Sequence, residues 1–357
     1  MESLAPIVIF TYTRLDTLKK TIKYLKLNNL ARLSEIYIFS DGYKSKIDKK
    51  YVLKVRKYLQ TIKGFKKINL IFKKKNFGLA DNIVKGVSNV IEKHGKIIVL
   101  EDDIVVSSNF LEYMNFALNK YQSIKKVWHI NSWNYNFKID ETEVNTFFTR
   151  VMNCWGWGTW KDRWKFFEKN PKKIIKNFSK KNIFNFNIEN SYDFWSQIKR
   201  NKSGSINTWA IFWYVNIFEN KGVCLSPVES LSKNIGYDNF SENIPNEQNS
   251  YEKIDKSFFL KKKKKFTFPK LTDENKLILN KIIKHLKNSK KKGSIFKRLI
   301  IKILNKLSFS SFYAANFFSK IFFLSNYNSQ HINLFKVKSF QGQTQINLTR
   351  SPSFKLL

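Results

Sequence analysis

The feature that most constrains the fold is an alternation, over residues 5–100, of short apolar runs with stretches of helical periodicity. Runs rich in β-branched and aromatic residues predict buried strands, and apolar residues three and four apart predict amphipathic helices. The predicted strands are Ala5–Tyr12, Glu35–Phe39, Ile68–Phe72 and Lys96–Leu100, and the predicted helices are Leu15–Leu27, Lys49–Ile62 and Gly78–His94. This order predicts an α/β fold, Rossmann-like, with a mixed and mainly parallel sheet flanked by helices.

Polar residues follow three of these predicted strands directly, at Thr11–Arg14, Ser40–Gly42 and Glu101–Asp103. In open α/β sheets, ligands bind outside the carboxyl ends of the strands, so these clusters are candidates for one binding site. Three consecutive carboxylates repel one another, and a hard divalent cation such as Mn²⁺ or Mg²⁺ would resolve that repulsion. The alternative is a solvated turn, whose carboxylates precede a helix that starts near Asn109.

Composition excludes several classes of protein. The chain has 357 residues, with 65 Lys and Arg against 27 Asp and Glu, which gives a formal net charge of +38. Because 43% of the residues are hydrophobic, the charge does not indicate disorder. Two cysteines exclude a disulfide scaffold, and the four histidines form no close pair. We expect no signal peptide and no membrane span, and therefore a cytoplasmic protein.

Basic residues are concentrated toward the C-terminus. Residues 253–357 contain 24 Lys and Arg and 3 Asp and Glu. The segments Lys276–Leu286 and Ile295–Leu307 are predicted to form basic amphipathic helices, which suit an anionic membrane surface. The alternative is a solvated helical appendage packed on the rest of the chain. Only eight of the basic residues are Arg, which argues against sequence-specific nucleic-acid binding.

Four segments carry a resemblance to a known family: Pro6–Arg14, Ile36–Gly42, Asn76–Leu79 and Val99–Tyr113. They resemble the GT-A glycosyltransferases over roughly residues 5–240. The similarity is greatest to the branch related to N-acetylglucosaminyltransferase I and to bacterial surface-polysaccharide transferases. The acidic triplet then corresponds to the DxD-type motif of that family.

The resemblance implies roles for individual residues. Asp103 would hold Mn²⁺ together with the nucleotide diphosphate, and Asp102 would lie near the ribose. Thr11 and Arg14 would contact the nucleotide, and Asp41 would read its base, since a carboxylate can accept the imide N–H of uracil. By their position, Asp81 and Asn82 would face the same nucleotide.

A Trp-rich segment, NCWGWGTWKDRW at Asn153–Trp164, has two interpretations. Its indoles form a buried layer, which is usual for Trp, or they offer faces to a sugar ring. The resemblance places a comparable segment near donor and acceptor. We therefore expect acceptor contacts among Trp155, Trp157 and Trp160, with one or two of them lining the site and the rest in the core.

The carboxylate that serves as catalytic base in the family has no counterpart at the matching position of this sequence. Inverting transfer needs a base for the acceptor hydroxyl, and relatives place a carboxylate just after a Trp that matches Trp209. Here Ala210, Ile211 and Phe212 follow, and none can accept a proton. The candidates, in order of preference, are Asp238, Glu229 and Asp193.

We therefore expect a metal-dependent, inverting glycosyltransferase that moves a sugar from a nucleotide-diphosphate donor, with UDP favoured, to a surface glycan or lipid-linked acceptor. Residues 1–252 would form the catalytic domain, with a nucleotide-binding half at 1–115 and an acceptor half at 116–252. Residues 253–357 would form a basic helical extension at the inner face of the membrane. The competing hypotheses are a nucleotidyltransferase-like enzyme, against which the lack of glycine in Thr11–Asp16 counts, and a basic nucleic-acid-binding protein.

Overall fold

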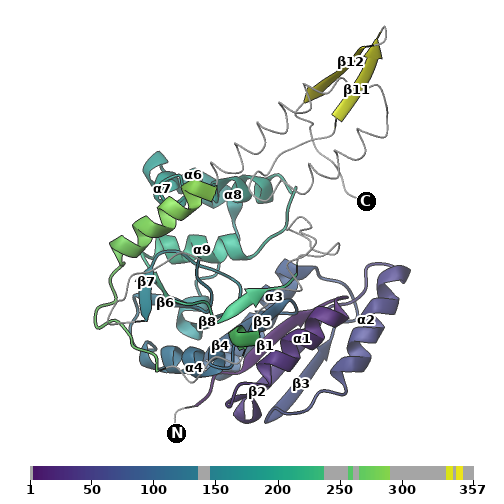
Figure 1. The fold of residues 1–357 in the computed structure, drawn as a ribbon, viewed down its shortest axis with the longest axis vertical. Coiled ribbons are helices and arrows are strands. Elements are labelled where there is room, and N and C mark those ends of the chain that lie inside the picture. Colours follow the sequence, from purple (N-terminus) through teal and green to yellow (C-terminus); the bar gives the residue numbers. More distant parts are fainter. Residues whose placement is uncertain are drawn as a thin grey trace.

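The structure is a computed structural model that describes residues 3–135, 145–236, 256–259, 265–289, 335–340 and 343–348. Its centre is an eight-stranded sheet with the order β3-β2-β1-β4-β8-β6-β9-β7 (Figure 1). The strands are β1 (Ile7–Thr11), β2 (Glu35–Ser40), β3 (Lys67–Phe72), β4 (Lys96–Glu101), β6 (Val127–Asn131), β7 (Thr146–Thr149), β8 (Trp157–Trp160) and β9 (Val223–Pro227). Neighbours β3, β2, β1 and β4 are parallel, whereas β8 is antiparallel to both β4 and β6.

Helices cover both faces of the sheet. They are α1 (Leu15–Leu25), α2 (Lys46–Leu59), α3 (Leu79–His94), α4 (Phe110–Lys120), α5 (Lys161–Trp164), α6 (Pro171–Asn177), α7 (Lys180–Phe186), α8 (Trp195–Lys202), α9 (Ala210–Glu219) and α10 (Lys256–Phe259). A short 3₁₀ turn (Ala31–Leu33) precedes β2, and β5 (Ile104–Val106) pairs with β10 (Ser232–Asn234) in a small second sheet. The predicted α/β class, with a mixed and mainly parallel sheet between helices, is confirmed.

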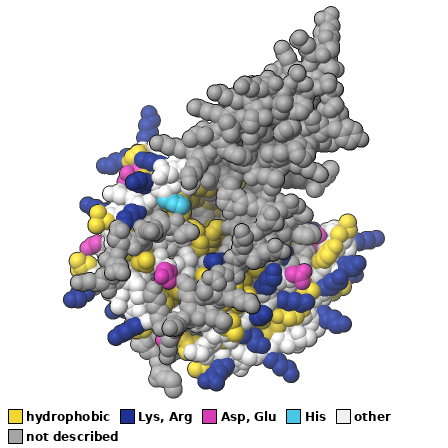
Figure 2. Space-filling view, viewed as in Figure 1, with side chains coloured by type: hydrophobic (Ala, Val, Ile, Leu, Met, Phe, Trp, Pro, Cys, Tyr) yellow, Lys and Arg dark blue, Asp and Glu magenta, His cyan; other side chains and the backbone are white. Residues whose placement is uncertain are grey.

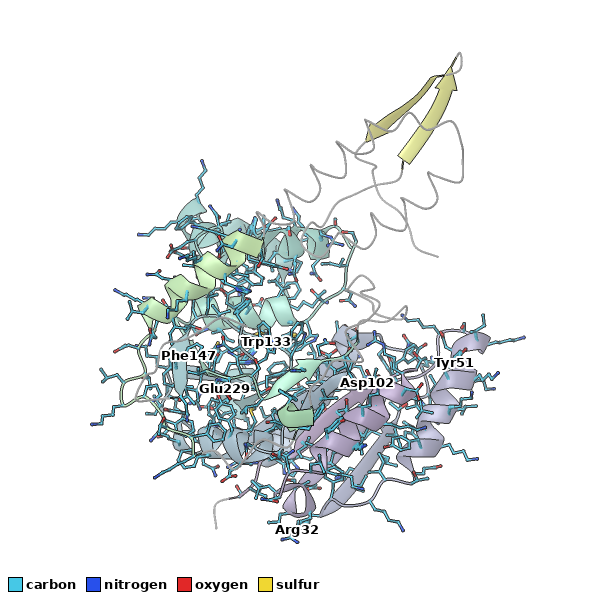
Figure 3. The ribbon with its side chains drawn as sticks, viewed as in Figure 1. Arg32, Tyr51, Asp102, Trp133, Phe147 and Glu229 are labelled. Carbon is cyan, nitrogen blue, oxygen red and sulfur yellow. The ribbon has the colours of Figure 1, made fainter. Side chains whose placement is uncertain are left out.

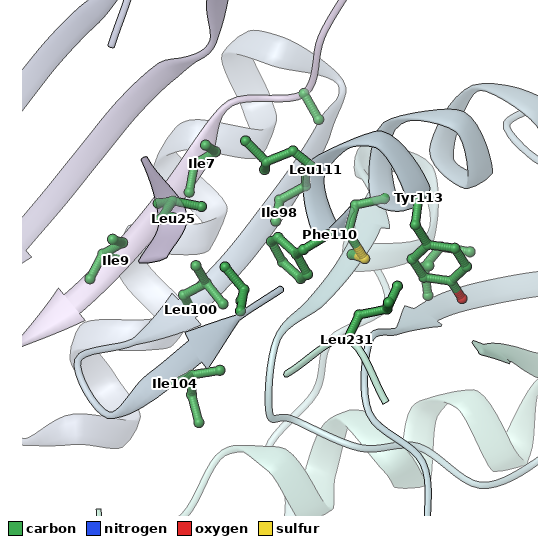
Figure 4. Close-up of a cluster of buried hydrophobic side chains, with 14 of the residues drawn as sticks. Ile7, Ile9, Leu25, Ile98, Leu100, Ile104, Phe110, Leu111, Tyr113 and Leu231 are labelled. Carbon is green, nitrogen blue, oxygen red and sulfur yellow. The ribbon is translucent and has the colours of Figure 1, made fainter. Parts of the chain in front are cut away.

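The alternation of inward and outward side chains along β1 divides the core between the two faces. Ile7 and Ile9 pack with Ile98, Leu100 and residues of α1, α2 and α4 (Figure 4). On the other face, Val8 and Phe10 pack with α3 and with the Trp side chains of α5 and α9. Both faces of this central strand are therefore buried from solvent, as a parallel sheet between two helical layers requires.

Local sequence signals set the ends of the helices. Ser45 caps α2, because its side chain accepts a hydrogen bond from the Asp48 backbone N–H at 3.1 Å. Gly95 ends α3 in the left-handed conformation, with φ of 75°, and β4 begins at the next residue. Pro171 at the first turn of α6 follows an Asn170 cap.

The predicted helix at Lys276–Leu286 is confirmed, since residues 276–289 are helical. Its apolar side chains Ile278, Leu279, Ile282 and Ile283 are buried in one cluster with Phe147, Val151 and Ile188. This hydrophobic cluster thus combines residues from before and after the predicted domain boundary at residue 252. The predicted helix at Ile295–Leu307 lies outside the described residues.

The C-terminal extension is also not wholly helical. Within it, β11 (Phe335–Phe340) and β12 (Gln343–Leu348) form an antiparallel pair, with Val337 opposite Ile346. The sequence signal for β11 is the alternation of apolar and basic residues in Phe335–Val337, which has a period of two. Within the part of the chain that the structure describes, no helix combines the length and apolar character needed to cross a membrane.

Candidate functional site

The polar residues at the ends of β1, β2 and β4 lie together in one cleft, as the sequence predicted. A cleft of about 150 Å³ opens at the carboxyl ends of β1, β2 and β4 and is lined in part by Asp102, which is labelled in Figure 3. Thr11 lies beside Ser40 and Phe10 beside Glu101 in the strand register, so the three ends are level. The lining residues are Phe10, Thr11, Tyr12, Thr13, Arg14, Asp41, Lys44, Asn76, Gly78, Leu79, Asn82, Glu101, Asp102 and Asp103.

Asp102 points inward, toward the loop that follows β1. Its Oδ2 atom accepts hydrogen bonds from Thr11 Oγ1 at 2.8 Å and from the Tyr12 backbone N–H at 3.2 Å. Burial and, after it, the neighbouring Asp103 raise the pKa of Asp102, Arg14 opposes them, and the net pKa is about 7. In this arrangement Asp102 joins the end of β4 to the end of β1.

Asp103 points the other way and forms an ion pair with Arg14. The distance from Arg14 Nη1 to Asp103 Oδ2 is 2.7 Å, and both side chains are about one-seventh exposed. The segment after β10 lies against this pair, because the Ile235 backbone N–H donates to Asp103 O at 2.8 Å. A Cβ atom on Gly236 would lie 2.0 Å from Asp103 Oδ2, so only glycine fits there without a shift.

Asp41 organises the turn that precedes α3. One carboxylate oxygen accepts from the backbone N–H groups of Gly42 at 2.8 Å and Phe77 at 3.1 Å. The other accepts from those of Phe77 at 3.1 Å and Gly78 at 3.0 Å. Asn76 closes the same turn by donating to Gly42 O.

The two candidate nucleotide-binding residues on α3, Asp81 and Asn82, point in different directions, and only Asn82 lines the cleft. Asn82 lines the cleft, is 4% exposed, and its Oδ1 atom has no hydrogen-bond partner among the described residues. Asp81 is exposed, is not among the cleft-lining residues, and its charge acts on Lys169. Adjacent positions on a helix point about 100° apart, which explains why one faces the cleft and the other does not.

The cleft fits a divalent cation only in part. Among the described residues, no group of three or more His, Cys, Asp or Glu could hold a metal ion. Asp102 Oδ2 is occupied by Thr11 and Tyr12, and Glu101 and Asp103 also line the cleft with their carboxylates. These hard oxygens suit Mn²⁺ or Mg²⁺ once phosphate oxygens complete the coordination shell.

The Trp residues of the predicted acceptor site are mostly core. Trp157 and Trp160 are each 1% exposed, so these two belong to the core, where the prediction placed all but one or two of the Trp residues. Trp157 packs between His129 and Trp209, and the Trp160 indole N–H donates to Leu118 O at 2.8 Å. Trp155 is partly exposed, and it is the residue of the three that remains a candidate.

Two aromatic residues beside Trp155 were missed from the sequence. Trp133 meets Trp155 edge to face with ring centroids 4.9 Å apart, and Tyr135 meets Trp133 at 4.8 Å. Next to Trp155, the thiol of Cys154 has its pKa raised by burial and by the charges of Glu101 and Asp103, so this cluster lies close to the acidic strand end. The missed signal is the position of Trp133 and Tyr135 just after β6, which runs parallel to β4.

The three base candidates differ in position. Asp193 caps α8, with its Oδ1 atom accepting from the Ser196 backbone N–H at 3.0 Å, and it is not among the cleft-lining residues. Glu229 is exposed in the connection between β9 and β10. Asp238 lies outside the described residues, two positions after the Gly236 that adjoins Asp103.

Comparisons with known proteins bear on the identity of the chain. Residues 87–208 match glycosyltransferase family 25 (LPS biosynthesis protein), and this range contains the acidic strand end and the Trp-rich segment. No curated protein matches the sequence.

Several solved structures share parts of the fold at low similarity. Residues 1–349 of S. aureus TarS show 10% identity and a TM-score of 0.33, with 46% of this chain and 48% of that chain covered. The mannosyltransferase PcManGT from Pyrobaculum calidifontis, in complex with GDP-Man and Mn²⁺, shows 8% identity and a TM-score of 0.34, with 61% and 68% covered. GalNAc-T7 with UDP, GalNAc and Mn²⁺ shows 11% identity and a TM-score of 0.39, with 63% and 42% covered.

A second, longer TarS structure is matched over only 25% of its own length. The TM-scores of these structures are too low to support an argument about function. The family match over residues 87–208 confirms the expected kinship with glycosyltransferases. Residues 87–208, which contain the acidic strand end, are therefore similar to glycosyltransferase family 25.

Proposed function

We propose that this chain is a metal-dependent, inverting glycosyltransferase that moves a sugar from a nucleotide-diphosphate donor, with UDP favoured, to a growing surface glycan such as lipopolysaccharide. The observation that carries the proposal is the cleft at the ends of β1, β2 and β4. It brings Thr11, Arg14, Asn82 and Asp103 together in a chain whose residues 87–208 match a glycosyltransferase family.

The donor diphosphate would lie beside Arg14 and Asp103. Arg14 supplies a guanidinium that can hold phosphate oxygens through two parallel hydrogen bonds. A cation held by Asp103 and the diphosphate would neutralise charge that builds on the departing nucleotide. Thr11 and Asp102 would shape the wall of the cleft next to the ribose.

The acceptor would lie against the partly exposed aromatic cluster of Trp133, Tyr135 and Trp155. Its hydroxyl needs a base in the inverting reaction. Asp238 is our first choice, because the chain reaches Asp103 at Gly236 two residues earlier. Glu229 follows, and Asp193 is third because its carboxylate already caps α8.

A donor screen tests the proposal. Purified protein is incubated with a panel of nucleotide sugars, with and without Mn²⁺, and release of the nucleotide or transfer is measured. We expect one donor to be used only with the cation, and Asp103→Asn to lower turnover on the order of 100-fold or more. Asp16→Asn is the matched control, since Asp16 is exposed in the first turn of α1 and is not among the cleft-lining residues.

Two results would contradict the proposal. One is that no nucleotide sugar binds in the presence of Mn²⁺. The other is that Asp103→Asn binds the donor with Mn²⁺ as tightly as the wild type.

We also propose that the basic region after residue 289 attaches the enzyme to the inner face of the cytoplasmic membrane. Since residues 276–289 pack into the core, the informative comparison is the full chain against one shortened after Ser289. Flotation with anionic vesicles should recover the full chain and leave the shortened chain in solution, and salt should weaken the binding. Equal flotation of both chains would remove the assigned role.

A further inference from the structure

Helix α2 has one face in the core and its other face at the edge of the molecule. Its buried side chains are Val52, Val55 and Leu59, and in Figure 1 the helix lies at the outer edge of the described part of the chain. Positions three and four apart on a helix share a face. The outer face consists of six exposed residues with this spacing: Lys46, Ile47, Lys50, Leu53, Lys54 and Lys57. We call these six residues the α2 surface.

The α2 surface combines positive charge with exposed apolar side chains. Four of its residues are lysines, and none of them forms an ion pair within the described residues. Between the lysines, Ile47 is 74% exposed and Leu53 is 49% exposed. Figure 2 shows hydrophobic and basic side chains next to one another along the edge where α2 lies. Lysines are spread over the whole molecule, so the apolar side chains among them are what distinguish this surface.

The chemistry of the α2 surface fits the anionic headgroup layer of a lipid bilayer. Each lysine near such a layer strengthens binding about fivefold. Exposed aliphatic side chains gain by entering the boundary between headgroups and acyl chains. A nucleic acid would engage the lysines but would leave Ile47 and Leu53 in water, because bases stack on aromatic rings.

A contact of this kind complements the basic region after residue 289. One weak attachment gives marginal, reversible membrane binding, and stable anchoring takes two. The α2 surface alone is therefore too weak to keep the protein on vesicles during flotation. Together with the basic region it supplies the second attachment, on a rigid part of the fold.

The α2 surface also lies beside the rim of the cleft. The Lys44 backbone N–H donates to the Tyr12 hydroxyl oxygen at 3.1 Å, and both residues line the cleft. The same hydroxyl donates to Asp48, in the first turn of α2, at 2.9 Å. Farther along the helix, Arg56 Nη2 donates to Asp41 O at 3.1 Å, just after β2. These contacts fix α2 to the cleft, so a bilayer on the α2 surface would lie next to the cleft rim.

We propose that the α2 surface is a membrane-contact surface that binds anionic phospholipids and holds the cleft rim beside the bilayer. The inference rests on the proposed attachment of the protein to a membrane, and it names the folded surface that makes the contact. Ile47 and Leu53 enter the headgroup layer, and the four lysines around them meet the lipid phosphates. A lipid-linked acceptor then reaches the cleft without leaving the bilayer.

Lipid titration of the full chain tests the inference. Vesicles of phosphatidylethanolamine and phosphatidylglycerol are added, and the bound fraction is measured at equilibrium at low and high salt. Ile47→Ser combined with Leu53→Ser leaves the charge unchanged and should lower the affinity about tenfold, because it removes the inserted apolar surface. Lys50→Gln combined with Lys54→Gln should lower the affinity about 10- to 30-fold at low salt and by less at high salt.

Leu271→Ser combined with Leu277→Ser is the matched control. These side chains are 73% and 77% exposed, and each follows a lysine in the sequence, but they lie outside the α2 surface. This variant should keep the wild-type affinity. Because all the substituted side chains are exposed, every variant should keep the wild-type melting temperature, which separates lost binding from misfolding.

A fluorescent label reports the contact directly. In a Cys154→Ser background, which removes the partly exposed thiol, an environment-sensitive label is attached through Ile47→Cys or through Leu277→Cys. On anionic vesicles, the emission of the label at position 47 should shift to shorter wavelength, because the label enters an apolar layer. The emission of the label at position 277 should not shift.

Three outcomes would overturn the inference. The Ile47 and Leu53 variant could bind vesicles as tightly as the wild type, the label at position 47 could keep its emission on vesicles, or the lysine variant could lose affinity for single-stranded RNA and none for vesicles. If the full chain binds vesicles regardless of these substitutions, only this inference fails. If it does not bind anionic vesicles at all, the membrane part of the proposed function fails as well.

Discussion

At the scale of single residues, the acidic strand end is stabilised by an oppositely charged neighbour. Asp102 and Asp103 are adjacent and largely enclosed, and the charge of Asp103 contributes to the raised pKa of Asp102. Arg14 offsets that repulsion through its 2.7 Å contact with Asp103. In the proposed reaction a cation would take over this role, which would free the guanidinium for phosphate.

Replacing Arg14 should therefore destabilise the chain when no cation is present. We expect Arg14→Met to lower the free energy of unfolding by about 1–3 kcal/mol at neutral pH, because it removes the guanidinium that contacts a largely buried carboxylate. Urea unfolding measures the loss. Addition of Mn²⁺ with UDP should recover part of it, and unchanged stability would show that the ion pair contributes nothing.

His129 is a second residue whose protonation state affects the stability of the fold. It is fully buried, its Nδ1 atom accepts from the Trp213 indole N–H at 3.1 Å, and its Nε2 atom lies 3.0 Å from Asn153 O. The neutral ring, with its proton on Nε2, satisfies both contacts. Burial lowers the pKa of His129 from 6.5 to about 4.

This shift makes stability depend on pH. The unfolded chain takes up a proton near pH 6.5, whereas the folded chain resists it until about pH 4. Stability from this group is therefore present above pH 6.5 and is lost as the pH falls toward 4, by up to roughly 3 kcal/mol. Unfolding curves of the wild type and His129→Gln should differ most at pH 7 and converge near pH 4. A constant difference would contradict this assignment.

At the scale of elements, α3 packs closely against the sheet next to the cleft. A Cβ atom on Gly86 would lie 2.5 Å from the Phe10 ring, and that ring is stacked on Phe39. Glycine at this position allows the helix to approach β1 closely. The distance between helix and strand in turn sets the position of Asn82.

Gly86→Ala tests this close approach, because the sign of the change in the free energy of unfolding shows whether the added methyl group fits. In an exposed helix the change would stabilise by about 0.5–1 kcal/mol. Here we expect a loss of about 1–3 kcal/mol, because the added methyl group must displace Phe10 or the helix. Lys85→Ala, at the exposed neighbouring position, should stay within about 0.5 kcal/mol. Thermal unfolding of both variants makes the comparison, and stabilisation by Gly86→Ala would show that the contact is loose.

The elements that sequence patterns predicted are those with strong local signals. β1, β2, β3 and β4 are continuous apolar runs, and each is followed by a helix or a polar turn. β6, β7 and β8 were missed because Val127–Asn131, Thr146–Thr149 and Trp157–Trp160 are short and carry no distinctive alternation. They become strands by pairing with neighbours distant in the sequence, for example Ile97 opposite Thr159.

At the scale of the whole molecule, the segment at residues 265–289 belongs to the main core. The Asn275 backbone N–H donates to Phe148 O at 2.7 Å, and Glu274 accepts from the Arg150 backbone N–H at 2.9 Å. Together with the buried face of the helix at 276–289, these contacts cover β7. The lysines of this segment are therefore part of the surface of one folded unit.

Ile282→Ala checks this assignment. Removing a side chain that is 1% exposed should cost about 2–4 kcal/mol. The midpoint of the whole unfolding transition should shift, with a single transition retained. A separate early transition, with the Trp fluorescence of the sheet region unaffected, would instead show that residues 265–289 unfold independently.

The high net charge is explained in part by its distribution. On the face in Figure 2, the described Lys and Arg side chains are spread around the outline and are not gathered into one patch. A spread of this kind fits a compositional background better than a nucleic-acid groove. Most of the Lys and Arg residues after residue 289 lie outside the described residues, and this region carries the membrane proposal.

The sequence by itself determined the α/β class, the positions of β1 to β4 and the strand-end residues Thr11, Arg14, Asp41 and Asp103, because these depend on local periodicity and on the rule that parallel strands end together. Only the tertiary structure decided which side chains reach the cleft. It separated Asn82 from Asp81, placed Trp157 and Trp160 in the core and enclosed Asp41 in a turn. Burial and hydrogen-bond partners come from segments distant in the chain, and no local pattern records them.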